Sequence, residues 1–118
     1  MATPTIHTPV AVDPVQLGTS VSTLYTAGAG GAVLDYILLV NDAAGPIKAT
    51  LHYVPSGGSA GDDNILCKDV VLSGGGWGIN LLEQVQARPF HMEPGSTIRG
   101  LATVAAQATV HIGGTDYA

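Results

Sequence analysis

Residues 33–54 read VLDYILLVNDAAGPIKATLHYV, and this stretch decides the fold class. The part from Val33 to Val40 is almost wholly apolar and rich in branched residues, which is typical of a strand covered on both faces. From Ile47 to Val54 the residues alternate between two faces, and this period of two predicts a strand with one buried face. Residues 41–46, NDAAGP, contain side chains, a glycine and a proline that favour a turn. The stretch therefore predicts a central antiparallel β-hairpin.

Similar apolar stretches, separated by turn signals, continue along the chain. Further strands are predicted at residues 20–26, 65–72, 79–85, 97–104 and 107–113, and the last two are expected to pair as a hairpin. Glu93-Pro94-Gly95 is typical of a β-turn because proline occupies its second position. Turn signals at intervals of about ten residues indicate a β-sandwich or a small barrel. We predict an all-β fold: a seven- or eight-stranded antiparallel β-sandwich over residues 18–118, either jelly-roll or Ig-like.

Residues 1–17 are expected to form an extended, proline-rich N-terminal arm. Its three prolines recur every five residues, and each fixes φ and lacks a backbone donor, so no helix can run through the segment. The arm is expected either to fray, as termini often do, or to be held down by its own domain or by a partner subunit. The residues predicted to make the partner contact are Pro4, Pro9, Val10, Val12, Pro14, Val15 and Leu17.

The composition excludes several kinds of partner. Only four of the 118 residues are basic, they are scattered, and the net charge is -5, so the clustered basic surface of a nucleic-acid-binding protein is not expected. No apolar run approaches the ~18 residues of a membrane span. Charged residues make up 11% of the chain, well below the usual ~25%. The surface is therefore rich in small neutral residues, which suits either a low-charge soluble domain or a subunit buried in an assembly.

No motif in the sequence points to an enzyme, a cofactor or a metal. A reactive nucleophile needs a base beside it, and the lone cysteine, Cys67, lies in an apolar strand where thiols are usually inert. The histidines lack metal-ligand spacing and are expected to be solvated; they are His7, His52, His91 and His111. We therefore expect no catalytic, cofactor-binding or metal-binding residues.

Three residues are kept as possible ligand-facing positions. Asp62 and Asp63 could begin a calcium site, but an exposed acidic turn is favoured because no further ligand follows at suitable spacing. Trp77 follows three glycines and could be an exposed platform for a sugar, or could close one end of the sandwich. Tyr36 and Tyr53 lie in apolar strands and are predicted to belong to the core.

Several tracts resemble one family of virion proteins. They are Leu24-Tyr25-Thr26-Ala27 before a glycine-containing turn, the strand ending at Asn41, the tract LHYVPSGG at 51–58, EPGSTIRG at 93–100 and ATVHIGG at 108–114. Over roughly residues 20–113 the chain resembles small virion proteins of tailed bacteriophages and related prophages. It departs from their pattern at Gly28, where proline is usual, and at Pro94 and Ser96 in the acidic turn. The motifs are structural, so the resemblance transfers no active-site residue.

The resemblance implies a β-sandwich that is built into a virion. We expect a non-enzymatic capsid decoration (cement) protein, made in the host cytoplasm, that forms a homotrimer and binds the major capsid protein or other virion proteins on the outer head surface. One alternative is a tail or fibre component. Another is a carbohydrate-binding module that uses Trp77 and residues 55–64.

Overall fold

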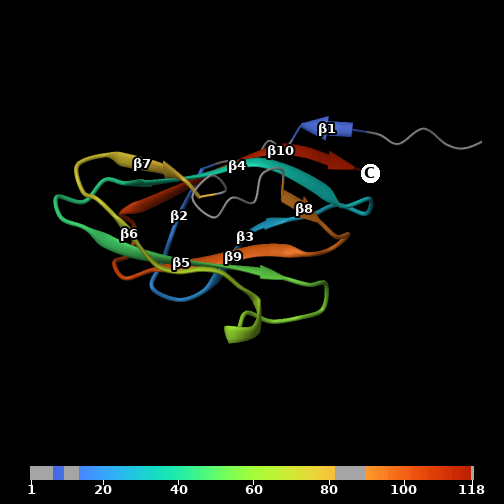
Figure 1. Cartoon of the computed structure of the whole chain (residues 1–118), viewed down its shortest axis with the longest axis horizontal. Coiled ribbons are helices and arrows are strands. Elements are labelled where there is room, and N and C mark those ends of the chain that lie inside the picture. The colour runs from blue at the N-terminus through green and yellow to red at the C-terminus, as the bar shows by residue number, and fades with distance from the viewer. Residues whose placement is uncertain (1–6, 10–13, 82–89, 118) are drawn as a thin grey trace, which may run out of the picture.

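The computed structural model describes residues 7–9, 14–81 and 90–117, and these residues form two antiparallel β-sheets packed face to face (Figure 1). This confirms the prediction of an all-β sandwich. A short 3-10 helix, η1 (Asp62–Asn64), precedes the sixth strand. The strands are β1 (His7–Pro9), β2 (Val15–Gln16), β3 (Ser22–Thr26), β4 (Ala32–Asn41), β5 (Ile47–Val54), β6 (Ile65–Leu72), β7 (Trp77–Asn80), β8 (Phe90–Met92), β9 (Thr97–Ala102) and β10 (Ala108–Tyr117).

Each sheet has four strand positions. The larger sheet has the order β1-β10-β4-β7, with β2 also paired to β10 and β8 also paired to β4. The smaller sheet has the order β3-β9-β5-β6. The sequence predicted seven or eight strands, whereas the described residues form ten strand segments. The number is larger because two strand positions are each divided into two segments: β1 and β2 both pair with β10, and β7 and β8 both pair with β4.

The predicted pairing of residues 33–40 with 47–54 is wrong, because β4 and β5 belong to different sheets. The intervening residues carry the chain across the sandwich, and the fully buried Asn41 fixes this corner. Its Nδ2 donates to the backbone oxygens of Gly45 (3.0 Å) and Leu72 (2.9 Å). Its Oδ1 accepts from the backbone N–H of Ala43 (2.8 Å). Asn41 thus joins the end of β4 to the end of β6.

The predicted hairpin between 97–104 and 107–113 is also wrong, since β9 lies in the smaller sheet and β10 in the larger one. The crossing is held by backbone hydrogen bonds to neighbouring connections. Thr103 N–H donates to Lys48 O (2.9 Å), and Asp42 N–H donates to Gln107 O (2.9 Å). The link between β9 and β10 therefore packs against the corner between β4 and β5.

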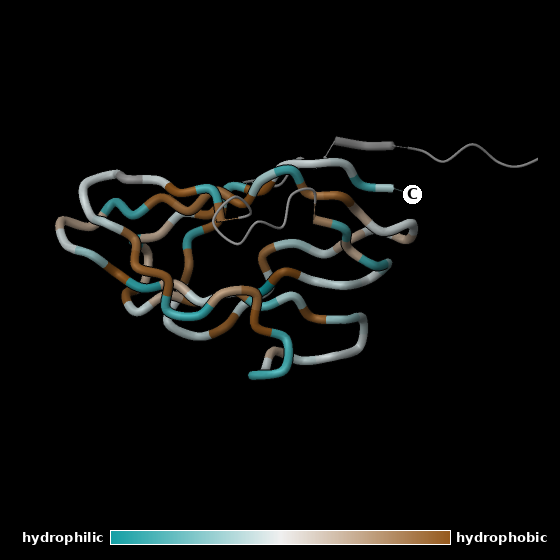
Figure 2. The backbone as a smooth tube through the Cα atoms, viewed as in Figure 1, coloured by the Kyte–Doolittle hydropathy of each residue, from teal (hydrophilic) through white to brown (hydrophobic). Residues whose placement is uncertain are grey.

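The core lies between the two sheets, and apolar segments occur in the strands of both layers (Figure 2). β4 was expected to be covered on both faces, but its buried residues lie on one face and half-buried or exposed residues on the other. Among the described residues, no helix has the length and apolarity that crossing a membrane would require. The largest fully buried apolar side chains are Leu17, Leu34, Ile37, Leu39, Leu51, Leu72, Leu81, Ile98, Val54 and Val110.

Candidate functional site

A β-bulge in the middle of β4 places two successive side chains on the outer surface. Tyr36 is paired with Gly113 of β10, and Leu34 is paired with Gly114, so Asp35 is one extra residue on the β4 side. Bulges often re-aim side chains next to functional sites. Here the bulge leaves both Asp35 and Tyr36 exposed, whereas strict alternation would turn one of them inward.

The ring of Tyr36 lies against the backbone of Gly113. A Cβ atom built on Gly113 would overlap the Tyr36 ring carbons, so only glycine leaves room for the ring at this point. Tyr36 nevertheless keeps 42% of its surface exposed. The prediction that Tyr36 belongs to the core is therefore wrong. The glycine of one strand supports the aromatic ring of the next, and the other side of the ring contributes to the surface.

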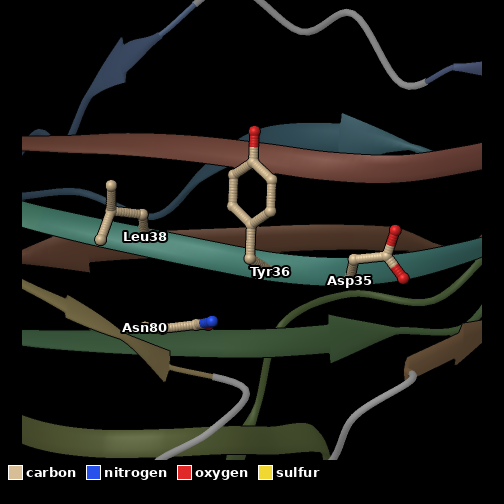
Figure 3. A pocket seen from close by; sticks show the side chains of 4 residues that line it. All are labelled: Asp35, Tyr36, Leu38 and Asn80. Atoms are coloured by element: carbon tan, nitrogen blue, oxygen red, sulfur yellow. The ribbon is translucent and has the colours of Figure 1, made fainter.

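Around Tyr36 the outer face of the larger sheet forms a pocket of about 390 Å³, lined by Asp35, Tyr36, Leu38 and Asn80. Figure 3 shows the first three along β4 and Asn80 on the neighbouring β7. The Oδ1 atom of Asn80 accepts a hydrogen bond from Ile37 N–H (3.4 Å), which orients its amide at the wall of the pocket. Within the described part of the chain, no hydrogen bond or ion pair to the Asp35 carboxylate occurs. We call this the Tyr36 pocket.

A second groove, of about 410 Å³, lies at one end of the smaller sheet and is lined by Pro46, Ile47, Lys48, Val71 and Thr103. Val71 is 58% exposed, and Val104, beside Thr103 in the chain, is 45% exposed. β6, which carries Val71, is an edge strand of its sheet. We call this groove together with Val104 the Val71 patch.

The structure places the C-terminal part of the predicted arm on its own domain. Pro14 is exposed, Val15 is half-buried and pairs with Val110 in β10, and Leu17 is fully buried in the core. Pro9 ends β1 and pairs with Thr115. The other predicted arm contacts, at Pro4, Val10 and Val12, lie outside the described residues.

The residues proposed as ligand-facing are spread over separate places. Asp62 and Asp63 are exposed in η1, and among the described residues no group of three metal-ligating side chains occurs. Trp77 begins β7 opposite Asn41, and its side chain lies outside the described part. The structure therefore brings neither aspartate into the Tyr36 pocket, whose own residues were not predicted as a site.

The loop over residues 55–64 covers part of the smaller sheet. Asn64 organises it: its Oδ1 accepts from Gly61 N–H (3.0 Å) and contacts His52 Nδ1 (3.0 Å), and its Nδ2 donates to Ser59 O (2.8 Å). His52 is buried as a result, with 7% of its surface exposed, and Val54 is fully buried. The expectation that His52 is solvated is wrong, because the loop over residues 55–64 folds over it and Asn64 contacts its ring.

Burial raises the pKa of two titratable side chains, Cys67 and Tyr25. Burial raises the pKa of the Cys67 thiol and outweighs the opposing effect of a hydrogen bond with the Leu51 backbone. Burial raises the pKa of Tyr25 strongly, and a hydrogen bond to Asp116 and the charge of that carboxylate add to the effect. The Tyr25 hydroxyl donates to Asp116 Oδ2 (2.5 Å), and Gly28 N–H donates to Oδ1 (3.1 Å). These contacts fasten the end of β10 to the turn after β3.

Comparison with family models, with curated proteins and with solved structures finds no match to this chain in any of the three.

Proposed function

We propose that this chain is a non-enzymatic structural protein of a tailed-bacteriophage virion. In this proposal it is a decoration protein that binds the outer surface of the capsid as a homotrimer. The support comes from the sequence resemblance, the strand order and the exposed Val71 patch. A tail or fibre position is the alternative within the same class of protein.

The strand order supports the jelly-roll type of sandwich over the Ig-like type. The chain visits the two sheets alternately at β3, β4 and β5, and again at β8, β9 and β10. The resulting orders, β1-β10-β4-β7 and β3-β9-β5-β6, are those of a jelly roll made from two Greek keys. Jelly rolls are used in viral capsid and lectin domains, although a fold alone does not define a function.

The Val71 patch is the observation that carries the assembly role. Val71 exposes a branched apolar side chain in a groove whose described lining residues include one charged residue, Lys48. Val104, which follows the lining residue Thr103 in the chain, is exposed as well. Burying such a surface against a partner removes apolar area from water while few charges lose their hydration. Apolar surface that remains open on a folded chain often marks an interaction site. We therefore assign the capsid contact to this end of the smaller sheet.

The experiment compares variants for their binding to phage heads that lack the protein. Val71→Asp places a charge in the patch and should abolish decoration while the circular dichroism spectrum stays unchanged. Val21→Asp is the matched control, because Val21 is an exposed valine as well (43%) but precedes β3 at the opposite edge of the same sheet. Full decoration by Val71→Asp, or equal loss with Val21→Asp, would contradict the assignment.

Antibody labelling of intact particles then tests the location. Label spread over the heads is the expected result. Label confined to tails would replace decoration with a tail or fibre role, and label on no particle would remove the virion proposal.

A further inference from the structure

The Tyr36 pocket is built in a way that a purely structural sheet surface does not require. A bulge exposes Asp35 and Tyr36 side by side, and a glycine in the facing strand leaves room for the ring. A purely structural role, in which the Tyr36 ring covers the glycine of the neighbouring strand, would explain the contact between the ring and the Gly113 backbone. It does not explain the pocket of about 390 Å³ that includes the ring and a carboxylate without a described partner.

The lining of the pocket combines apolar and polar groups. Tyr36 and Leu38 supply apolar surface, while Asp35 and Asn80 supply polar side chains. Small-molecule sites commonly have this character: mostly apolar and aromatic walls with a few placed polar groups. Asn80 is held in place by its hydrogen bond from Ile37 N–H, so part of the wall is preformed.

This chemistry fits a neutral saccharide. One face of a pyranose ring is made of C–H groups, which pack on an aromatic ring, and its rim carries hydroxyl groups that donate to a carboxylate. We propose that the Tyr36 pocket binds a neutral sugar unit of a glycan. The ring of Tyr36 is the platform on which the sugar packs, and the Asp35 carboxylate accepts hydrogen bonds from the sugar hydroxyl groups.

Two other ligand chemistries fit the pocket less well. An anionic ligand would meet the carboxylate of Asp35, which repels it. A quaternary ammonium group is usually enclosed by several aromatic rings, whereas Tyr36 is the one aromatic residue among the described lining residues. The proposal does not depend on the virion role, because the Tyr36 pocket and the Val71 patch lie on different sheets.

The test begins with the purified 118-residue chain on an array of neutral oligosaccharides and bacterial polysaccharides. The best-binding glycan is then titrated in solution and followed by NMR. We expect the resonances of the Tyr36 ring and the Gly113 amide to shift, while those of the Val71 patch stay in place. Binding to no glycan on the array, or shifts confined to other parts of the chain, would overturn the proposal.

Variants assign the roles of the two central residues. Tyr36→Ala should weaken binding about tenfold, whereas Tyr36→Phe, which keeps the ring, should stay within about twofold of the original chain. Asp35→Asn, at an exposed position, should weaken binding several-fold without disturbing the fold. Val21→Ser, at an exposed position outside both the Tyr36 pocket and the Val71 patch, is the control that should leave glycan binding unchanged. Unchanged affinity in both Tyr36→Ala and Asp35→Asn would refute the site. Choline chloride serves as the cationic probe, and choline binding more tightly than any glycan would replace the saccharide with a cation.

Discussion

Replacing Asn41 by alanine removes only a small side chain, but it should lower the free energy of unfolding substantially. The side chain is fully buried and makes three hydrogen bonds to the backbone of Ala43, Gly45 and Leu72. Removing it leaves one N–H and two carbonyl groups without these partners at a buried corner. At about 1 kcal/mol for each bond, and more where the abandoned group stays dry, the loss is about 3–4 kcal/mol.

Asn64→Ala provides the matched comparison. Asn64 also makes three side-chain hydrogen bonds, to Gly61, Ser59 and His52, but it lies in the half-exposed loop over residues 55–64. Water can replace most of these bonds when the side chain is removed, so we expect a loss of about 1 kcal/mol. Because both side chains make three hydrogen bonds, the difference in stability loss between the two variants measures the effect of burial.

The assay is urea unfolding followed by circular dichroism, with the slope of the free energy against denaturant compared among the proteins. A loss of 3–4 kcal/mol is a large part of the roughly 5–15 kcal/mol that stabilises a domain, and it should lower Tm by more than about 10 °C. The reasoning is refuted if Asn41→Ala loses no more stability than Asn64→Ala while the slopes are equal.

Three further predictions follow from the described contacts. Gly113→Ala should displace the ring of Tyr36, which NMR would detect as changed ring resonances. It should lower the free energy of unfolding by about 1 kcal/mol, and by less when Tyr36 is also replaced by alanine. Tyr25→Phe should cost about 1–2 kcal/mol through the lost bond to Asp116. The pKa of Tyr25 is higher in the folded chain than its unfolded value of about 10. The stabilisation that Tyr25 provides is therefore complete below pH ~10 and is lost as the pH rises toward the folded-state pKa. Above pH ~10, urea midpoints should fall less steeply in Tyr25→Phe than in the original chain. Cys67, buried and with a raised pKa, should react with a thiol reagent slowly in buffer and rapidly in denaturing urea.

The local features of the fold could be predicted from sequence. The strands at 47–54 and 65–72 have the predicted bounds, because their apolar runs end at clear turn signals. The β-turn at Glu93-Pro94-Gly95 is also confirmed: Ser96 N–H donates to Glu93 O (3.1 Å), and Gly95 has a φ of +74°.

Strand pairing could not be predicted in the same way. Alternation tells which face of a strand is buried, but it does not identify the neighbouring strand. Residues 41–46 contain the same turn-forming residues whether the chain folds back within one sheet or crosses to the other. The crossing is decided by Asn41, whose Nδ2 reaches Leu72 on a strand that comes much later in the chain.

The Tyr36 pocket was missed because a bulge breaks the period of two. Leu34 and Ile37 are three positions apart and both fully buried, which strict alternation forbids; one extra residue between them, Asp35, restores the inward phase. The sequence carries two traces of this arrangement: an acidic residue inside the apolar run at 33–40, and the pair Gly113-Gly114 in the last strand. Neither is informative alone, since acidic residues also occur at strand surfaces and glycine pairs at turns. They become a site only when β4 and β10 pair, because that pairing sets the ring of Tyr36 against the one residue type that leaves it room.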